Sequence, residues 1–217
     1  MKKISILLAS TLLIACTNNS KNNATKKIAE IWSAKDCRKD DSQKTITLTI
    51  EEPKKIEANY PNENMTSMSA FTYINESKPE DYKTMDSIKV IIKEGGSNFE
   101  KNYKITDVVN AKGYFEIIDD FSAKIITGNL NGIETYFDKQ IISDSIITRI
   151  KTGINDLSKK NGAYTKSTIV FFDVKTLEKK NEPVLVTNFV VSNNEYYTDL
   201  KVIFRQSDKK IIFFGLN

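Results

Sequence analysis

The chain has 217 residues, of which 40% are hydrophobic, 28% charged and 10% aromatic, and its formal net charge is +4. It contains no histidine, which excludes Ser-His-Asp and Cys-His catalysis and any metal site that depends on imidazole ligands. Two cysteines are too few for a disulfide framework or a four-sulfur zinc site. The composition therefore predicts a globular protein with an apolar core and without several common kinds of catalytic site.

The N-terminus has the pattern of an export signal. Lys2 and Lys3 precede an apolar run over residues 4–15, which is too short for a membrane-spanning helix of roughly 20 residues. The run ends in Leu-Ile-Ala-Cys at residues 13–16. These four residues resemble the lipobox of bacterial lipoproteins, in which an aliphatic residue opens the motif and a small residue stands before the cysteine. The alternative is an ordinary signal peptide whose last small residue happens to precede a cysteine.

The resemblance to lipoproteins implies a membrane anchor. In that family the signal is cut before the cysteine, and fatty acyl chains such as palmitate modify its thiol and its new amine. Carried over, residues 1–15 are the signal peptide and Cys16 is the lipidation site. Several acyl chains, at about 0.8 kcal/mol per buried methylene, make a durable anchor. The resemblance implies a cell-envelope location, and Thr17 in place of aspartate points to the outer membrane if the cell has one, with the periplasmic or surface side left open.

The charged residues argue against nucleic-acid binding. Removal of residues 1–15 takes away two lysines, so the mature chain has 30 basic and 28 acidic residues, or +2. Only Arg38, Arg149 and Arg205 are arginines, and the lysines alternate with acids instead of clustering. Phosphate and base-edge recognition favours clustered arginine, so we expect no nucleic-acid partner.

Residues 16–43 are rich in Asn, Lys and Asp, which predicts a lipid-anchored polar tether. Its apolar residues suggest one short helical turn over residues 28–33. Trp32 is expected to dock on the folded domain, with the lipid surface as the alternative. Cys37 is expected to be a plain free thiol, although pairing with another chain or a redox role stays open.

Residues 44–95 predict a β-rich segment. Residues 45–50 alternate strictly, which places Ile46, Leu48 and Ile50 on one face and three threonines on the other. Further strands are expected over residues 68–75 and 87–94, followed by a turn at Gly95-Gly96. Whether this segment is a separate domain or joins the C-terminal sheet stays open.

Residues 96–217 predict helices followed by a sheet. The helical stripes recur at spacings of three and four residues and comprise Phe115, Ile118, Phe121 and Ile125 in one helix and Ile146, Ile150, Ile154 and Leu157 in another. The second of these helices begins after Ser143 and stops at Gly162, and a short helix fits residues 130–137. A hairpin over residues 123–138 is the alternative to helix there.

Four strands are expected over residues 166–176, 183–192, 195–205 and 210–216, joined by short polar turns into an antiparallel meander. In the third strand, Tyr196 should share the buried face with Thr198 and Leu200, while Tyr197 faces outward. The predicted fold class is α+β, with helices packed on a curved antiparallel sheet that ends in the meander, preceded by the short β-rich segment.

This order resembles the nuclear-transport-factor-2-like (cystatin-like) cone fold over about half the chain. The resemblance rests on the phrase NLNGIETYF at residues 129–137 and on the closing strands DLKVIF at 199–204 and KIIFF at 210–214. A competing resemblance is to PsbP- or DcrB-like lipoproteins, which begin with strands and would use the hairpin over 123–138. The cone fold implies a pocket between helices and sheet, used by some members for catalysis and by others for binding.

The cone pocket, if present, would collect Tyr114, Asp120, Glu134 and Tyr136, the candidate ligand-pocket residues. Relatives that resemble ketosteroid isomerase use a carboxylate base and a tyrosine, but no spacing here singles out such a pair. Adjacent Asp119 and Asp120 would point about 100° apart on a helix and cannot share a proton. No phosphate-binding glycine loop or calcium-binding loop occurs, so we expect no metal and no cofactor.

Three functions are compatible with these patterns. The first is a non-enzymatic, lipid-anchored binding or accessory protein of the envelope, with a protein or small apolar ligand as its partner. The second is an isomerase-like or hydrolytic enzyme, which a buried carboxylate facing a tyrosine in the pocket would favour. The third is a structural interaction protein, which an exposed apolar patch on the meander would favour.

Overall fold

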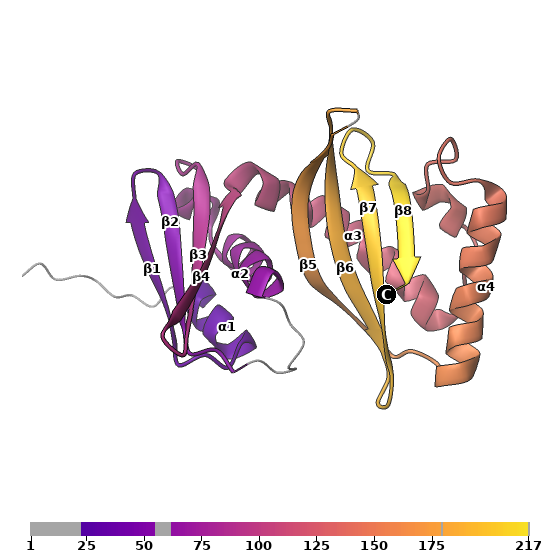
Figure 1. Ribbon diagram of the computed structural model, residues 1–217, viewed down its shortest axis with the longest axis horizontal. Coiled ribbons are helices and arrows are strands. Elements are labelled where there is room, and N and C mark those ends of the chain that lie inside the picture. Colours follow the sequence, from indigo (N-terminus) through magenta and orange to yellow (C-terminus); the bar gives the residue numbers. More distant parts are fainter. Residues whose placement is uncertain (1–22, 55–61, 179, 217) are drawn as a thin grey trace, which may run out of the picture.

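The computed structural model describes residues 23–54, 62–178 and 180–216, so the predicted signal peptide and Cys16 lie outside the described residues. The fold is α+β, with two four-stranded sheets and helices between and beside them (Figure 1). Among the described residues, no helix combines the length and the apolar character needed to cross a bilayer.

The first sheet has the order β1-β2-β3-β4 and consists of β1 (Asp36–Ser42), β2 (Thr45–Glu51), β3 (Ser87–Glu94) and β4 (Ser97–Lys104). Two antiparallel hairpins are joined by a parallel β2–β3 pair, because α2 (Asn62–Glu76) carries the chain back to the starting edge. The predicted alternation in β2 is confirmed, since Ile46, Leu48 and Ile50 are fully buried. Helices α1 (Asn23–Ile31) and α2 cover this inner face (Figure 1), and a 3-10 turn, η1 (Pro79–Asp81), leads into β3.

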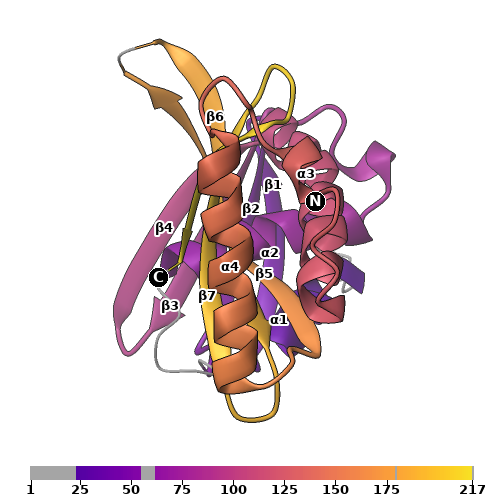
Figure 2. The same cartoon turned by 90° about the vertical axis from the view of Figure 1, so that its right-hand side faces the viewer.

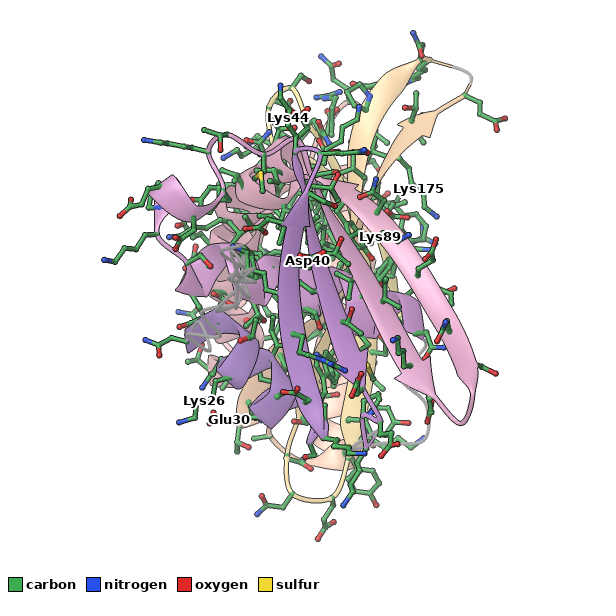
Figure 3. All side chains as sticks on the ribbon, turned by 90° about the vertical axis from the view of Figure 1, so that its left-hand side faces the viewer. Lys26, Glu30, Asp40, Lys44, Lys89 and Lys175 are labelled. Atoms are coloured by element: carbon green, nitrogen blue, oxygen red, sulfur yellow. The ribbon has the colours of Figure 1, made fainter. Side chains whose placement is uncertain are left out.

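The prediction of a polar tether through residue 43 is wrong for residues 23–31 and 36–42, which form α1 and β1. Helix α1 buries Ala24 and Ile28, and the predicted docking of Trp32 is confirmed. The indole Nε1 of Trp32 donates a hydrogen bond to Ser69 Oγ at 2.8 Å. Strand β1 is an edge strand, and its charged side chains, among them Asp40 in Figure 3, disfavour pairing with a strand of another chain.

The strand predicted over residues 68–75 is also wrong, because these residues lie in α2. Small polar residues let this helix lie close to both sheets: Thr66, Ser67 and Ser69 are buried. The hydroxyls of Thr66 and Ser67 donate to carbonyl oxygens one turn earlier, which satisfies them inside the helix. The predicted strand over residues 87–94 and the turn at Gly95-Gly96 are confirmed, but β4, which follows the turn, was not predicted.

Three helical segments follow: α3 (Ile105–Thr127), the 3-10 helix η2 (Ile133–Tyr136) and α4 (Asp144–Asn161). The predicted stripe of α3 is buried, and left-handed Gly128 ends the helix. Residues 123–138 therefore contain the end of α3, a turn and η2, and they do not form the alternative hairpin. Helix α4 begins after Ser143 and ends before Gly162, as predicted. The buried face of α4 differs from the predicted one, however: Ile147 is buried, while Ile146, which was predicted to be buried, is 36% exposed.

The second sheet is the predicted antiparallel meander, in the order β5-β6-β7-β8. Its strands are β5 (Lys166–Leu177), β6 (Glu182–Ser192), β7 (Tyr197–Arg205) and β8 (Ile211–Leu216). In Figure 2, α4 stands in front of β7 and α3 lies to the right of the meander. The expectation that Tyr196 points into the core is wrong: Tyr196 precedes the first residue of β7, and both it and Tyr197 are exposed.

The two sheets share one hydrophobic core, although the strands of residues 44–95 do not join the meander. Phe172 of β5 lies at the junction, with its ring centroid 5.7 Å from Phe115, 6.0 Å from Tyr103 and 6.4 Å from Phe71. These contacts join β5 to α3, β4 and α2. Helix α3 therefore connects the first sheet to the meander through continuous packing.

Candidate functional site

The predicted pocket residues Asp120 and Tyr136 lie together. The Tyr136 hydroxyl donates a hydrogen bond to the Asp120 carboxylate, and its ring packs edge-on against Phe121 at 5.5 Å. Partial burial, and then the bond to Asp120 and its charge, raises the pKa of Tyr136 to about 12. Asp120 is exposed and Tyr136 half-buried, so this carboxylate–tyrosine pair lies at the surface.

The other two predicted pocket residues make separate contacts. Glu134 Oε2 accepts a hydrogen bond from Lys151 Nζ at 3.0 Å, which joins η2 to α4. Hydrogen bonding to backbone and to Lys151 holds the pKa of Glu134 below its usual value. The Tyr114 hydroxyl donates to the Gln206 carbonyl at 3.3 Å, which joins α3 to the β7–β8 turn.

The space between the helices and the meander is almost filled. A gap of about 10 Å³ remains, lined by Ile125, Ile154, Leu157, Tyr164, Val191, Thr198, Leu200 and Leu216. A cavity needs about 10–15 Å³ of such volume to hold a single water molecule. None of the four predicted pocket residues lines this gap. It therefore offers no room for a ligand in this conformation.

A larger cavity of about 480 Å³ is an open groove between α1 and the start of β1, with Cys37 in its lining. The Cys37 side chain is a free thiol and only 4% exposed. Burial, and secondly the charge of Asp36, raises its pKa from about 9 to about 12, so the thiol is neutral and a poor nucleophile. Among the residues that the structure describes, no cluster of three acidic or cysteine side chains could hold a metal ion.

The meander face opposite α3 carries several apolar side chains. Directly paired residues point to the same face of a sheet, so Asp173, Val186, Ile203 and Phe213 form one row across all four strands. We use the name outward strip for its apolar part and the apolar residues of the adjoining rows: Phe171, Val186, Val190, Ile203 and Phe213. In Figure 1 this face is toward the viewer and α3 lies behind the sheet.

Phe213 is the exposed member of the outward strip, at 46%, whereas Phe171, Val190 and Ile203 are half-buried and Val186 is buried. Its ring lies across Gly215, since a Cβ atom there would come within 3.0 Å of Phe213 Cε1. Asn188 lies between Val186 and Val190 on the same face of β6, and its buried Oδ1 has no hydrogen-bond partner within the described part of the chain. The strip thus combines an exposed aromatic ring with a buried acceptor that still lacks a donor.

Charged side chains border the outward strip. Lys101 of β4 reaches over the Phe171 ring at 5.9 Å and lies 3.2 Å from Asp173. Lys175 pairs with the same carboxylate at 4.0 Å, and Lys201 lies in register with Asn188. An apolar centre with a charged rim is the usual composition of a protein–protein interface.

The outward strip could have been predicted from apolar doublets in the strands. Phe171-Phe172, Val190-Val191 and Phe213-Phe214 each place one residue on either face of a strand. A meander covered on one side only should alternate apolar and polar residues, so three doublets indicate that both faces are partly apolar.

Comparisons with protein-family models, with curated proteins and with solved structures found no match to this chain. The resemblances to lipoproteins and to the cone fold therefore stay predictions.

Proposed function

We propose that the protein is a lipid-anchored envelope protein that acts by binding another protein through the outward strip. The observation that carries the proposal is the exposed Phe213 ring in an apolar strip that crosses the open face of the meander. Contiguous apolar patches on folded domains are typical of interaction sites.

Two observations favour a protein partner over an internal small ligand or a catalytic pocket. The gap between the helices and the meander holds about 10 Å³, far below the several hundred of a typical ligand pocket, and the 480 Å³ groove between α1 and β1 is open to solvent and does not enclose a ligand. The Asp120–Tyr136 pair lines neither this gap nor the α1–β1 groove. A sheet face that mixes apolar and charged side chains suits a folded partner better than a small molecule.

Photo-crosslinking in living cells tests the partner surface. A photoreactive amino acid at position 213 should give one discrete adduct, while the same residue at position 47, on the outer face of the first sheet, should give none. Adding Ile203→Asp to the position 213 variant should abolish the adduct, because a charge in the strip resists desolvation. Circular dichroism must show that this variant is folded. Equal adducts at positions 213 and 47, or none at 213, would contradict the proposal.

The anchor is tested separately at Cys16. Cys16→Ala should release the protein from the membrane fraction, and the N-terminal peptide of the parent protein should carry the mass of its acyl chains. Full membrane retention of the variant, or an unmodified parent peptide, would exclude lipidation. The outer membrane is the proposed location if the cell has two membranes, and density-gradient fractionation of the parent protein tests this.

A further inference from the structure

The connection between β6 and β7 is held rigidly by one side chain. Asn193 Oδ1 accepts hydrogen bonds from the backbone N–H groups of Glu195 at 2.9 Å and Tyr196 at 2.8 Å. Its Nδ2 donates to the Asn161 carbonyl at 2.8 Å, at the end of α4. The turn and the C-terminal end of α4 therefore form one fixed unit, which we call the hairpin tip (residues 159–166 and 192–198).

Two neighbouring tyrosines project from the hairpin tip. Tyr196 is 49% and Tyr197 63% exposed, the highest exposed fractions among the large apolar side chains that the structure describes. Both tyrosine side chains lie outside the core, whereas the nearby Tyr164 hydroxyl forms a hydrogen bond with Thr198 Oγ1 at 2.7 Å inside it. Tyrosine combines an apolar ring with a polar end, which suits it to the boundary between lipid tails and water.

The hairpin tip also carries an excess of positive charge. Lys159 and Lys160 occupy the last turn of α4, and Lys166, which pairs in register with Ser192, begins β5. All three lysines are exposed, and Glu195 is the one carboxylate of the tip. Lysines beside exposed tyrosines are complementary to a bilayer surface that contains anionic lipid.

The short stretch of chain between Cys16 and the first described residue keeps the domain near the bilayer. The first described residue, Asn23, follows Cys16 by seven positions, and seven extended residues span at most about 25 Å. The β6–β7 connection and the C-terminal end of α4 lie at the lower end of the molecule in Figure 1, and α1 lies in its lower half. A short connection to α1 can therefore bring this end onto the membrane.

We infer that the hairpin tip rests on the membrane surface, with Tyr196 and Tyr197 among the lipid headgroups and the three lysines against their phosphates. This inference builds on the proposed anchor at Cys16. It leaves the outward strip free for a partner, because the strip extends upward from the tip along the strands in Figure 1.

The test attaches the chain to vesicles chemically, so it does not depend on lipidation in the cell. The chain from residue 16 onward is coupled through its Cys16 thiol to a maleimide lipid in vesicles of phosphatidylcholine and phosphatidylglycerol, and buried Cys37 does not compete. Tyr197→Trp places a fluorophore on the tip. The matched control is Val109→Trp, at a 41% exposed site in the early turns of α3, which lie in the upper half of the molecule in Figure 1.

Lipid brominated near the headgroup should quench the emission added by Tyr197→Trp by at least about half and leave that added by Val109→Trp unchanged. Replacing Lys159, Lys160 and Lys166 by glutamine should reduce this quenching in anionic vesicles only. Equal quenching at both positions, or none at position 197, would overturn the inference. Either result would leave the anchor proposal standing, since that proposal is judged by the Cys16→Ala release experiment.

Discussion

Replacing Trp32 tests whether the segment before β2 belongs to the folded domain. The indole ring is 8% exposed, and a tryptophan buries about 150–250 Å². At about 25 cal/mol per Å², this burial is worth about 4–6 kcal/mol, and a compact unfolded state reduces the figure by 10–40%. We therefore expect Trp32→Ala to lower the free energy of unfolding by about 3–5 kcal/mol, the usual range for buried aromatic residues.

Trp32→Phe separates the ring from the hydrogen bond. It keeps most of the apolar contact but leaves the buried Ser69 hydroxyl without its donor, at a cost of about 1–2 kcal/mol. In a double-mutant cycle with Ser69→Ala, the effects of Trp32→Phe and Ser69→Ala on the free energy of unfolding should deviate from additivity by about 1 kcal/mol.

The assay is urea denaturation of the chain from residue 16 onward with Cys16→Ser, followed by far-ultraviolet circular dichroism because tryptophan emission is lost. Val109→Ala, at a site 41% exposed on α3, serves as a surface control and should change stability by less than about 0.5 kcal/mol. If Trp32→Ala is as stable as this control, α1 is not docked on the domain, and the prediction of a tether through residue 43 would be correct.

Three further predictions concern single side chains. Cys37 should react with a disulfide reagent only after unfolding. Because folding raises the pKa of this thiol from about 9 to about 12, the thiol ionises first in the unfolded state. Its contribution to the free energy of unfolding should therefore be full below pH 9 and be lost as the pH rises toward 12. Asp138→Ala should lower the thermal midpoint measured by circular dichroism, because the carboxylate is 6% exposed and lies 2.7 Å from Arg205 Nη1, whose charge would lose this partner. Gly215→Ala should keep the fold but weaken the crosslink at position 213, because its Cβ displaces the Phe213 ring.

The meander could be predicted from sequence because its signals are local. Each strand carries a long apolar run, and the turns around Asn193 and Asp208 are short and polar. The ends of α4 were equally clear, since Ser143 and Gly162 are the usual residues for beginning and stopping a helix. Such patterns depend on a few neighbouring residues and not on the rest of the fold.

Helix α2 could not be predicted in this way. Residues 68–75 contain aromatic and β-branched residues that favour strands, and only the tertiary structure shows why they are helical. The small side chains of Ser67 and Ser69 allow the helix to lie between two sheets, where Ser67 Oγ also accepts from the Phe172 N–H at 3.4 Å. Burial between two layers outweighs local preference here.

The contact between Asp120 and Tyr136 shows the same limit. Asp120 and Tyr136 are sixteen residues apart, and they meet because Gly128 turns the chain back at the end of α3. No spacing rule links two residues on either side of such a turn. The outward strip, in contrast, follows from the apolar doublets, because alternation along a strand fixes which residue faces outward.

The packing around Phe172 predicts that the two sheets unfold together. Its ring is 1% exposed and contacts residues of α2, α3 and β4, so Phe172→Ala should cost about 3–5 kcal/mol. Native-state hydrogen exchange should then show the same loss of protection at Leu48 of β2 and Phe189 of β6, because each opens only with the shared core. If protection falls in one sheet alone, α3 does not couple the sheets, and the anchored end of the protein could unfold without disturbing the partner-binding face.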